Sequence, residues 1–292
     1  MQGEGAVNTQ FWVIQTFNGV SYAALLFLVG SGLSLIFGVM RIVNLAHGSY
    51  FLLGGYVALS VIWTTGSWVL AIPVAALSIA LVGLLMERFF LRPLGFDPLR
   101  QVLLTVGFAF LFQQAALDIW TGNNFNINPP GALTKSIVVG GIYLPLYRAF
   151  MIGVALAMGL ILWLVMEKTR MGAAVRATVD DAQMARGVGI DTSRISMFIF
   201  ALGAFLAALG GVIGGAFLGI YPGLDFEILP LAFAVVIIGG MGSLGGAAIG
   251  ALLVGLADNF GKALFPEISY FTLYAPMALI LAVKPTGLFG RE

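Results

Sequence analysis

The feature of this sequence that most constrains its fold is a series of long apolar segments separated by short charged stretches. Several of them reach or pass the roughly 20 residues that an α-helix needs to cross about 30 Å of hydrocarbon. The sequence therefore predicts an all-α fold, a polytopic transmembrane helical bundle of about eight membrane elements. The apolar segments cover roughly residues 17–40, 42–63, 67–86, 101–120, 149–166, 197–220, 229–257 and 268–283.

Composition argues against a soluble globular domain. The chain is 60% hydrophobic and only 9% charged, with a mean hydropathy of +1.02, whereas soluble domains carry about 25% charged residues. The 39 glycines fit transmembrane helices, in which small residues let backbones approach closely. A net charge of +1 gives no indication of a nucleic-acid partner, so the expected surroundings are the lipid bilayer.

Residue types that carry chemistry are scarce. The chain has no cysteine and a single histidine, His47, which leaves no basis for thiol catalysis, a disulfide or a histidine-rich metal centre. We therefore expect no catalytic residues, no metal and no cofactor bound by this chain. Residues 1–10 contain no Lys or Arg before the first apolar run. A cleaved signal peptide is not expected, and the first segment should remain as a membrane helix.

The segment 229–257 does not fit a simple crossing. As one helix it would be about 43 Å long, and as two full crossings each would be too short. Glycines at 239, 240, 242, 245 and 246 interrupt it, which predicts a short helix, a tight elbow and a second helix, crossing once, twice or re-entering. The glycine placement in 243–257 resembles that in 44–58. This suggests internal repeats with both breaks bordering one cavity.

The distribution of positive charge predicts the orientation. Placing the N-terminus outside, in the periplasm, and the C-terminus in the cytoplasm puts 11 of the 14 Lys and Arg residues in the cytoplasm and leaves only Lys135, Arg148 and Lys262 outside, as the positive-inside rule requires. Residues 121–147 then form a polar external excursion. We expect residues 1–292 to form a single transmembrane domain with a cytoplasmic loop at 167–194.

The loop 167–194 holds 9 of the 27 charged residues. Residues 172–186 are predicted to form one amphipathic helix, because Val175, Val179, Ala182 and Ala185 recur at spacings of three and four. Glycines at 187 and 189 would end it. The loop is either a solvated linker or a docking element whose small-residue face, Ala182 included, enters a groove on a cytoplasmic partner.

Two sets of polar residues lie near the ends of apolar segments. Arg41, Asn44 and His47 interrupt the first two segments. They form either a short turn in which Arg41 snorkels and His47 caps a helix, or part of a pathway or gate, the default hypothesis for polar groups inside a membrane. Acidic residues near the expected outer helix ends are interpreted as interfacial or docking contacts; these are Asp118, Asp225, Glu227 and Asp258.

Three runs together resemble one family. The run TRMGAAVRATVDDAQMARGVGID (169–191) is similar to the cytoplasmic coupling loop of permease subunits in branched-chain amino acid ABC importers. The runs GLSLIFGVMRIVNLAHGSYFLLGGYVAL (32–59) and VVIIGGMGSLGGAAIGALLVGLAD (235–258) resemble the first helices and a C-terminal region of the same permeases. Urea and short-chain amide permeases share most of this pattern, so they remain an alternative.

The resemblance implies a subunit of the bacterial inner membrane that works with a second permease subunit, which is a homologue or another copy, two cytoplasmic ATPase subunits and a periplasmic substrate-binding protein. Pathway or gate candidates are then Asn44, His47, Gly48, Gly242 and Gly245. ATPase-coupling candidates are Arg176, Asp180, Asp181, Ala182, Arg186 and Gly189.

ATP would be hydrolysed by the partner subunits. The sequence contains no G-x-x-x-x-G-K-[ST] phosphate loop, and its nearest fragment, residues 261–263, has neither the spacing nor the hydroxyl. Two alternatives come from other classes: an ion-coupled secondary transporter, which needs carboxylates inside the membrane, and a channel or structural membrane protein. The large cytoplasmic loop argues against both. The exact substrate stays open, since an external binding protein would set much of the selectivity.

Overall fold

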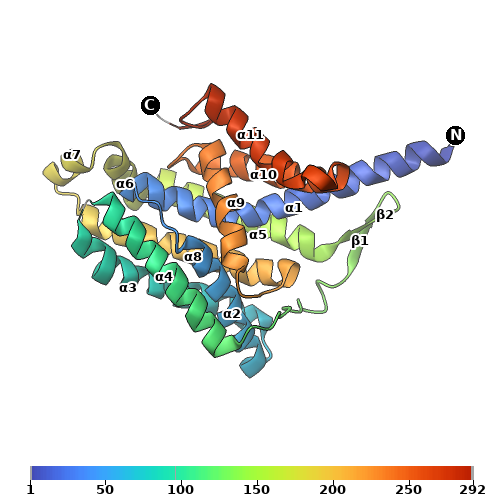
Figure 1. Cartoon of the computed structure of the whole chain (residues 1–292), viewed down its shortest axis with the longest axis horizontal. Coiled ribbons are helices and arrows are strands. Elements are labelled where there is room, and N and C mark those ends of the chain that lie inside the picture. The colour runs from blue at the N-terminus through green and yellow to red at the C-terminus, as the bar shows by residue number, and fades with distance from the viewer. Residues whose placement is uncertain (1, 96, 291–292) are drawn as a thin grey trace.

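The structure, a computed structural model, describes residues 2–95 and 97–290 of the chain (Figure 1). Its elements are almost all helices. In chain order they are α1 Gln2–Met40, α2 His47–Thr65, α3 Trp68–Met86, a π-helical turn Glu87–Leu91, a 3-10 turn Arg92–Leu94, α4 Pro98–Trp120, β1 Ser136–Val139, β2 Ile142–Pro145, α5 Leu146–Lys168, α6 Arg170–Asp180, α7 Ala182–Gly187, α8 Thr192–Leu218, α9 Leu224–Gly239, α10 Leu244–Leu264, a 3-10 turn Pro266–Ile268 and α11 Ser269–Val283.

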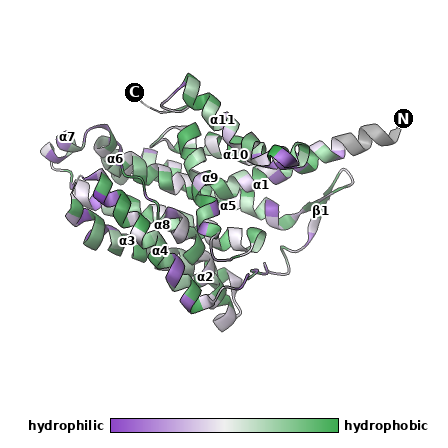
Figure 2. Ribbon diagram, viewed as in Figure 1, coloured by the Kyte–Doolittle hydropathy of each residue, from purple (hydrophilic) through white to green (hydrophobic). Residues whose placement is uncertain are grey.

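The predicted polytopic helical bundle is confirmed. Six helical stretches of the described chain are long and apolar enough to cross a membrane; they are Thr9–Met40, Trp68–Leu94, Pro98–Trp120, Leu146–Lys168, Thr192–Leu218 and Leu244–Leu264. Helices α2, α9 and α11 are also apolar but are not among these six. The predicted number of eight elements is therefore not reproduced by this criterion. Figure 2 shows that hydrophobic residues predominate along these helices.

Helices α1 and α8 form the centre of the bundle. About 72% of the apolar window of each lies buried, against 22% for α4 and α5, which therefore present broad apolar faces outward. Glycines allow the central helices to approach. A Cβ at Gly211 of α8 would collide with the carbonyl of Phe51 in α2, and a Cβ at Gly54 would lie 2.5 Å from the Ala208 backbone. These α2–α8 contacts depend on the absence of side chains.

The predicted break in 229–257 is confirmed. Helix α9 ends at Gly239, α10 begins at Leu244, and Gly240 and Gly242 in the elbow have φ angles of 97° and 79°, which glycine adopts without strain. With 16 residues, α9 is only about 24 Å long, and it runs across α1 in Figure 1. The carbonyls at its end accept bonds from the C-terminal tail: the Leu288 N–H donates to Ile238 at 2.9 Å and the Phe289 N–H to Gly239 at 3.0 Å.

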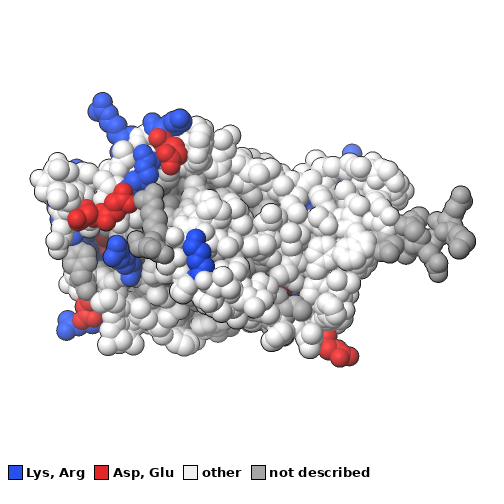
Figure 3. All heavy atoms as spheres, turned by 90° about the horizontal axis from the view of Figure 1, so that it is seen from above, with Lys and Arg blue, Asp and Glu red and all other residues white. Residues whose placement is uncertain are grey.

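The two ends of the molecule differ in charge. Helices α6 and α7 lie at one end, and the β1–β2 hairpin lies at the other with the start of the chain (Figure 1). In the face that Figure 3 shows, most charged side chains gather at the α6–α7 end. The antiparallel hairpin lies within the expected polar excursion, residues 121–147, and pairs Val139 with Ile142. The sequence did not predict these two strands.

Candidate functional site

The polar interruption after α1 turns back into the bundle. Arg41 is exposed and has a φ of 55°, an uncommon conformation for a residue with a side chain. Six residues later the His47 ring lies beside α1, where its Nε2 is 3.0 Å from the Val29 carbonyl. Val29 precedes the last residue of α1 by 11 positions, so α2 begins about 16 Å from that helix end. Of the two alternatives for this stretch, a short surface turn capped by His47 does not agree with the burial of the ring.

Asn44 and His47 are both fully buried at this start of α2. The Asn44 Oδ1 accepts a hydrogen bond from the Ala46 N–H at 3.1 Å, and Ala46, the N-cap residue, offers no side-chain cap. The His47 Nδ1 has no hydrogen-bond partner among the described residues, whereas the Asn44 side chain also bonds with the Tyr50 hydroxyl. Buried polar atoms normally have partners, so each exception requires an explanation.

Asp225 joins the same region from α9. It is 2% exposed, and its Oδ2 accepts a hydrogen bond from the Ser49 hydroxyl at 3.0 Å. Gly48 makes this contact possible, because a Cβ there would collide with the Asp225 carbonyl. The expectation that Asp225 is an interfacial contact is therefore wrong. The pair Pro222–Gly223 marks the true start of α9 at Leu224 and was the signal available in the sequence.

The other acidic residues differ from Asp225. Asp118 and Glu227 are exposed, as an interfacial interpretation expects. Asp258 is 6% exposed and pairs with Lys262 at 2.8 Å. Glu227 accepts a hydrogen bond from the Tyr221 hydroxyl at 2.8 Å. Burial, with this bond as a second cause, raises the pKa of Tyr221 to about 12, so the hydroxyl stays protonated and continues to donate at neutral pH.

The two predicted glycine candidates near the C-terminus lie in different places. Gly242 lies against the end of α1, where a Cβ at Gly38 would come 2.7 Å from its Cα. The Ser34 hydroxyl also donates to the Ser243 carbonyl at 3.4 Å. A Cβ added at Gly245 would contact no other atom. Gly245 lines an apolar cavity of about 400 Å³ between α1, α5 and α10. The elbow therefore adjoins the end of α1, whereas Gly245 faces elsewhere.

The loop 167–194 forms two helices rather than the single one predicted. Asp181 separates them, and its Oδ1 accepts the Gln183 and Met184 N–H groups at 2.8 and 2.9 Å, which starts α7. Gly189, with a φ of 89°, ends the second helix, and Asp191 caps α8. The Asp181 carboxylate satisfies two backbone N–H groups at the start of α7. This capping favours a new helix start at residue 182 over continuation of α6.

The expected docking face is directed at the bundle. Val175 and Ala185 are each 3% exposed, and Ala182 is half-buried. Two of the four residues on this face thus pack on the bundle, and Val179 and Ala182 keep part of their surface free. The large apolar side chains that α6, α7 and the following turn leave exposed are Met171, Met184 and Val188, at 41%, 66% and 71%.

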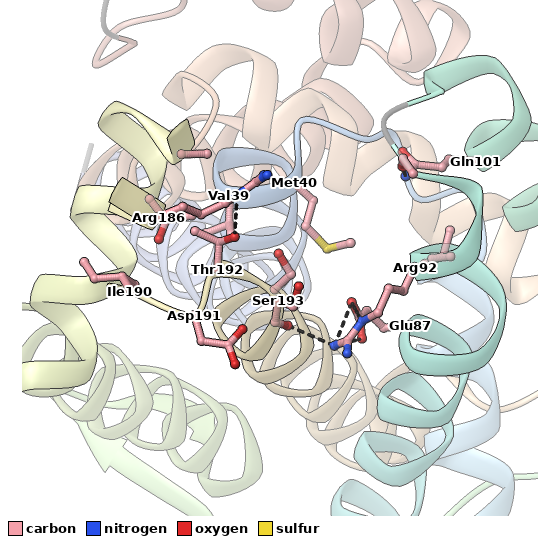
Figure 4. A pocket seen from close by; sticks show the side chains of 15 residues that line it. Val39, Met40, Glu87, Arg92, Gln101, Arg186, Ile190, Asp191, Thr192 and Ser193 are labelled. Carbon is pink, nitrogen blue, oxygen red and sulfur yellow. Dashed lines mark hydrogen bonds and ion pairs between the residues drawn. The ribbon is translucent and has the colours of Figure 1, made fainter. Parts of the chain in front are cut away.

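A cavity of about 300 Å³ lies between the loop, the end of α1, the two turns that follow α3, and the starts of α4 and α8 (Figure 4). Arginines connect its walls. The Arg186 Nε donates to the Thr192 Oγ1 at 2.9 Å, and Arg92 donates to the Ser193 carbonyl at 3.0 Å while it pairs with the buried Glu87 at 3.1 Å. Ala182 lines the same cavity. Arg186 thus ties α7 directly to the first residue of α8.

Helix α6 is joined to the end of α5. A Cβ at Gly172 would collide with the Met166 carbonyl, to which Arg176 also donates, and Arg176 lies 3.7 Å from Glu167. Asp180 ends α6. Within the described part of the chain, no group of three His, Cys, Asp or Glu residues is arranged to hold a metal ion.

Comparisons with known proteins agree with the observed architecture. The family model described as "Branched-chain amino acid transport system / permease component" matches residues 15–281. The high-affinity branched-chain amino acid transport system permease protein LivH of Escherichia coli K12 is 31% identical over 96% of both chains, and that of Salmonella typhimurium is 30% identical over the same shares. The corresponding permease protein BraD of Pseudomonas aeruginosa is 28% identical over 95% of both.

Proposed function

Because the chain belongs to the family of permease components of branched-chain amino acid transport systems, and is thus a multi-pass transport subunit of the inner membrane rather than an enzyme, we propose that it translocates leucine, isoleucine and valine. The observation that carries the proposal is the similarity to LivH and BraD over nearly the whole length of each chain. The ion-coupled alternative loses its basis with this family membership.

The proposed assembly contains this chain, a second permease subunit, two ATPase subunits that bind ATP, and a periplasmic binding protein. The N-terminus lies in the periplasm and the C-terminus in the cytoplasm, in agreement with the concentration of charged side chains at the α6–α7 end (Figure 3). The loop 167–194 then contacts the ATPase subunits. Its candidate residues Arg176, Asp180, Asp181, Arg186 and Gly189 shape the loop, and Met184 and Val188 supply the exposed contact surface.

We place the solute pathway beside the start of α2, where Asn44, His47 and Gly48 lie against α1 and α9. The proposal is supported by two buried polar atoms without partners, the His47 Nδ1 and the Asp225 Oδ1, since polar groups at membrane depth commonly mark a substrate route. The contact between Gly242 and Gly38 forms the cytoplasmic end of this route. Gly245 faces the apolar cavity and is not part of it.

Reconstitution tests the proposed function. Vesicles containing both permeases, both ATPases and ATP are supplied with the binding protein and labelled leucine, with isoleucine, valine, urea or acetamide as competitors. We expect ATP-dependent leucine uptake that isoleucine and valine inhibit and that urea and acetamide leave unchanged. Uptake of urea or acetamide without uptake of leucine contradicts the proposal and supports the related amide permeases instead.

A further inference from the structure

Asp225 is a buried carboxylate without a cation. Its Oδ2 accepts the Ser49 hydroxyl at 3.0 Å, its Oδ1 has no hydrogen-bond partner, and no Lys, Arg or His forms an ion pair with it within the described ranges. A carboxylate in an apolar interior is normally paired or bound to a cation. The positive end of the α9 dipole, in whose first turn Asp225 lies, offsets part of this negative charge. The described residues supply no full cation for the rest.

The groups nearest in sequence to Ser49 are hydrogen-bond donors. The Leu45, Ala46 and His47 N–H groups are already bonded, to Thr105 Oγ1, to Asn44 Oδ1 and to the Asn44 carbonyl. The positive end of the α2 dipole is therefore open to a ligand at the N–H groups of Gly48 and Ser49. Asn44, five residues before Ser49, is fully buried, and its side chain bonds with the Tyr50 hydroxyl. Gly48 and Ser49, which carry these N–H groups, both lie against Asp225. A zwitterion, which carries an ammonium and a carboxylate on one carbon, requires both a donor and an acceptor.

Aromatic side chains lie on α2 about two turns beyond Ser49. Tyr56, two turns after Ser49, stacks on Trp120 with ring centroids 4.9 Å apart, and Phe125 lies edge-on to Tyr56 and Trp63. Phe125 also pairs with Ile220 through two backbone hydrogen bonds of 2.8 and 2.7 Å. The loop that supplies Phe125 is therefore fastened to the segment that leads into α9, and both would move together.

We propose that Asp225 and Ser49 bind the ammonium group of the amino acid as it passes through the membrane, under the aromatic cover of Tyr56, Trp120 and Phe125. This rests on the function proposed above. The ammonium donates to the Asp225 Oδ1 and to a lone pair of the Ser49 hydroxyl, while the donors at the start of α2 receive the carboxylate. A bare metal ion fits less well, because one carboxylate and one hydroxyl provide too few oxygen ligands.

The first test uses the wild-type complex of permeases and ATPases without the binding protein. Its thermal unfolding midpoint is measured with leucine, with 3-methylbutylamine, which keeps the ammonium and lacks the carboxylate, and with 4-methylpentanoate, which lacks the ammonium. We expect leucine to raise the midpoint most, the amine to raise it less, and the acid to leave it unchanged. A rise with the acid that equals the rise with leucine overturns the proposal.

The second test is Asp225→Asn, which keeps the shape and removes the charge. Because a hydrogen bond to a charged group contributes more than a neutral one, we expect leucine uptake to fall roughly tenfold or more and the leucine-dependent rise in midpoint to disappear. Asp118→Asn is the matched control, since Asp118 is exposed and bonds Gln114 at 2.9 Å; it should transport at the wild-type rate.

The outcomes separate this site from the wider function. If the wild-type complex takes up leucine, and Asp225→Asn shows the same uptake and the same leucine-dependent rise in midpoint, the proposed site is wrong. The proposed transport function is then unaffected. Absence of leucine uptake by the wild-type complex refutes the function, while the amine and acid comparison still decides whether the site selects an ammonium group. If Asp225→Asn fails to assemble, the wild-type comparison alone decides.

Discussion

At the scale of single residues, the start of α2 shows which buried polar residues a sequence pattern can predict. Asn44 and His47 are detectable because they are polar residues between two apolar runs. Asp225 is not, because its burial comes from Ser49, 176 positions away in the chain, and because α9 begins five residues before the apolar segment that the sequence indicates. Long-range contacts of this kind leave no local periodicity.

His47→Ala tests the role of this histidine. The change removes the contact between the ring and the Val29 carbonyl and a buried polar atom beside the proposed route. Since the ring borders the proposed route, we expect leucine uptake to fall several-fold. Loss of one buried hydrogen bond costs about 1–3 kcal/mol of stability, which should leave most of the complex assembled. Immunoblotting of the purified complex and uptake assays measure the two quantities. Unchanged uptake would reduce His47 to a structural residue.

At the scale of helices, the contact between α2 and α8 depends on glycine. We expect Gly211→Ala to destabilise the protein by about 1–3 kcal/mol, because the added methyl would collide with the Phe51 carbonyl and overfilling a core costs about that much. Gly153→Ala in α5 is the control, since a Cβ there meets nothing and alanine favours a helix. Thermal unfolding in detergent compares them; equal midpoints would show that the helices can separate without loss.

The loop helices show the limit of amphipathic patterns. The spacing of Val175 and Ala185 correctly indicates one apolar face, but a pattern does not say whether that face meets the protein's own bundle or another subunit. Both residues are 3% exposed. The division at Asp181 also escapes the periodicity, because it depends on one side chain bonding two amide groups.

The exposed surface of α7 gives a prediction about coupling. We expect Met184→Glu to weaken association with the ATPase subunits severalfold, because it places a charge at a side chain that is 66% exposed and apolar. The amount of inserted permease should not change. Co-purification of the ATPase measures the effect, and Thr134→Glu in the external loop, also exposed, is the control. Equal co-purification of both variants would place the ATPase contact elsewhere.

At the scale of the whole molecule, the helical membrane architecture was predictable because long apolar runs have few alternatives. The orientation stays a prediction, and the lack of cysteine makes it testable. We expect Asn128→Cys to react with an impermeant maleimide in intact cells, whereas Gln183→Cys, in cells without the ATPase subunits, reacts only after the membrane is opened. Both positions are exposed. Labelling of residue 183 in intact cells reverses the orientation.

The tail that bonds the end of α9 has a consequence for a bacterium at rest. Across a bilayer each 100 mV is worth about 2.3 kcal/mol per elementary charge. A water-filled gap through the protein would therefore let protons flow continuously down the membrane potential. Gly287, with a φ of 80° and a Cβ position 2.5 Å from the Ile237 carbonyl, holds the tail over the elbow. We expect Gly287→Val vesicles to leak protons without ATP, as a pH-sensitive dye reports, and Gly131→Val vesicles to stay tight. Equal leak rates would show that the tail does not limit proton permeability at the elbow. A faster leak in Gly287→Val would show that the tail keeps the inactive importer impermeable to protons, so that the membrane potential is maintained.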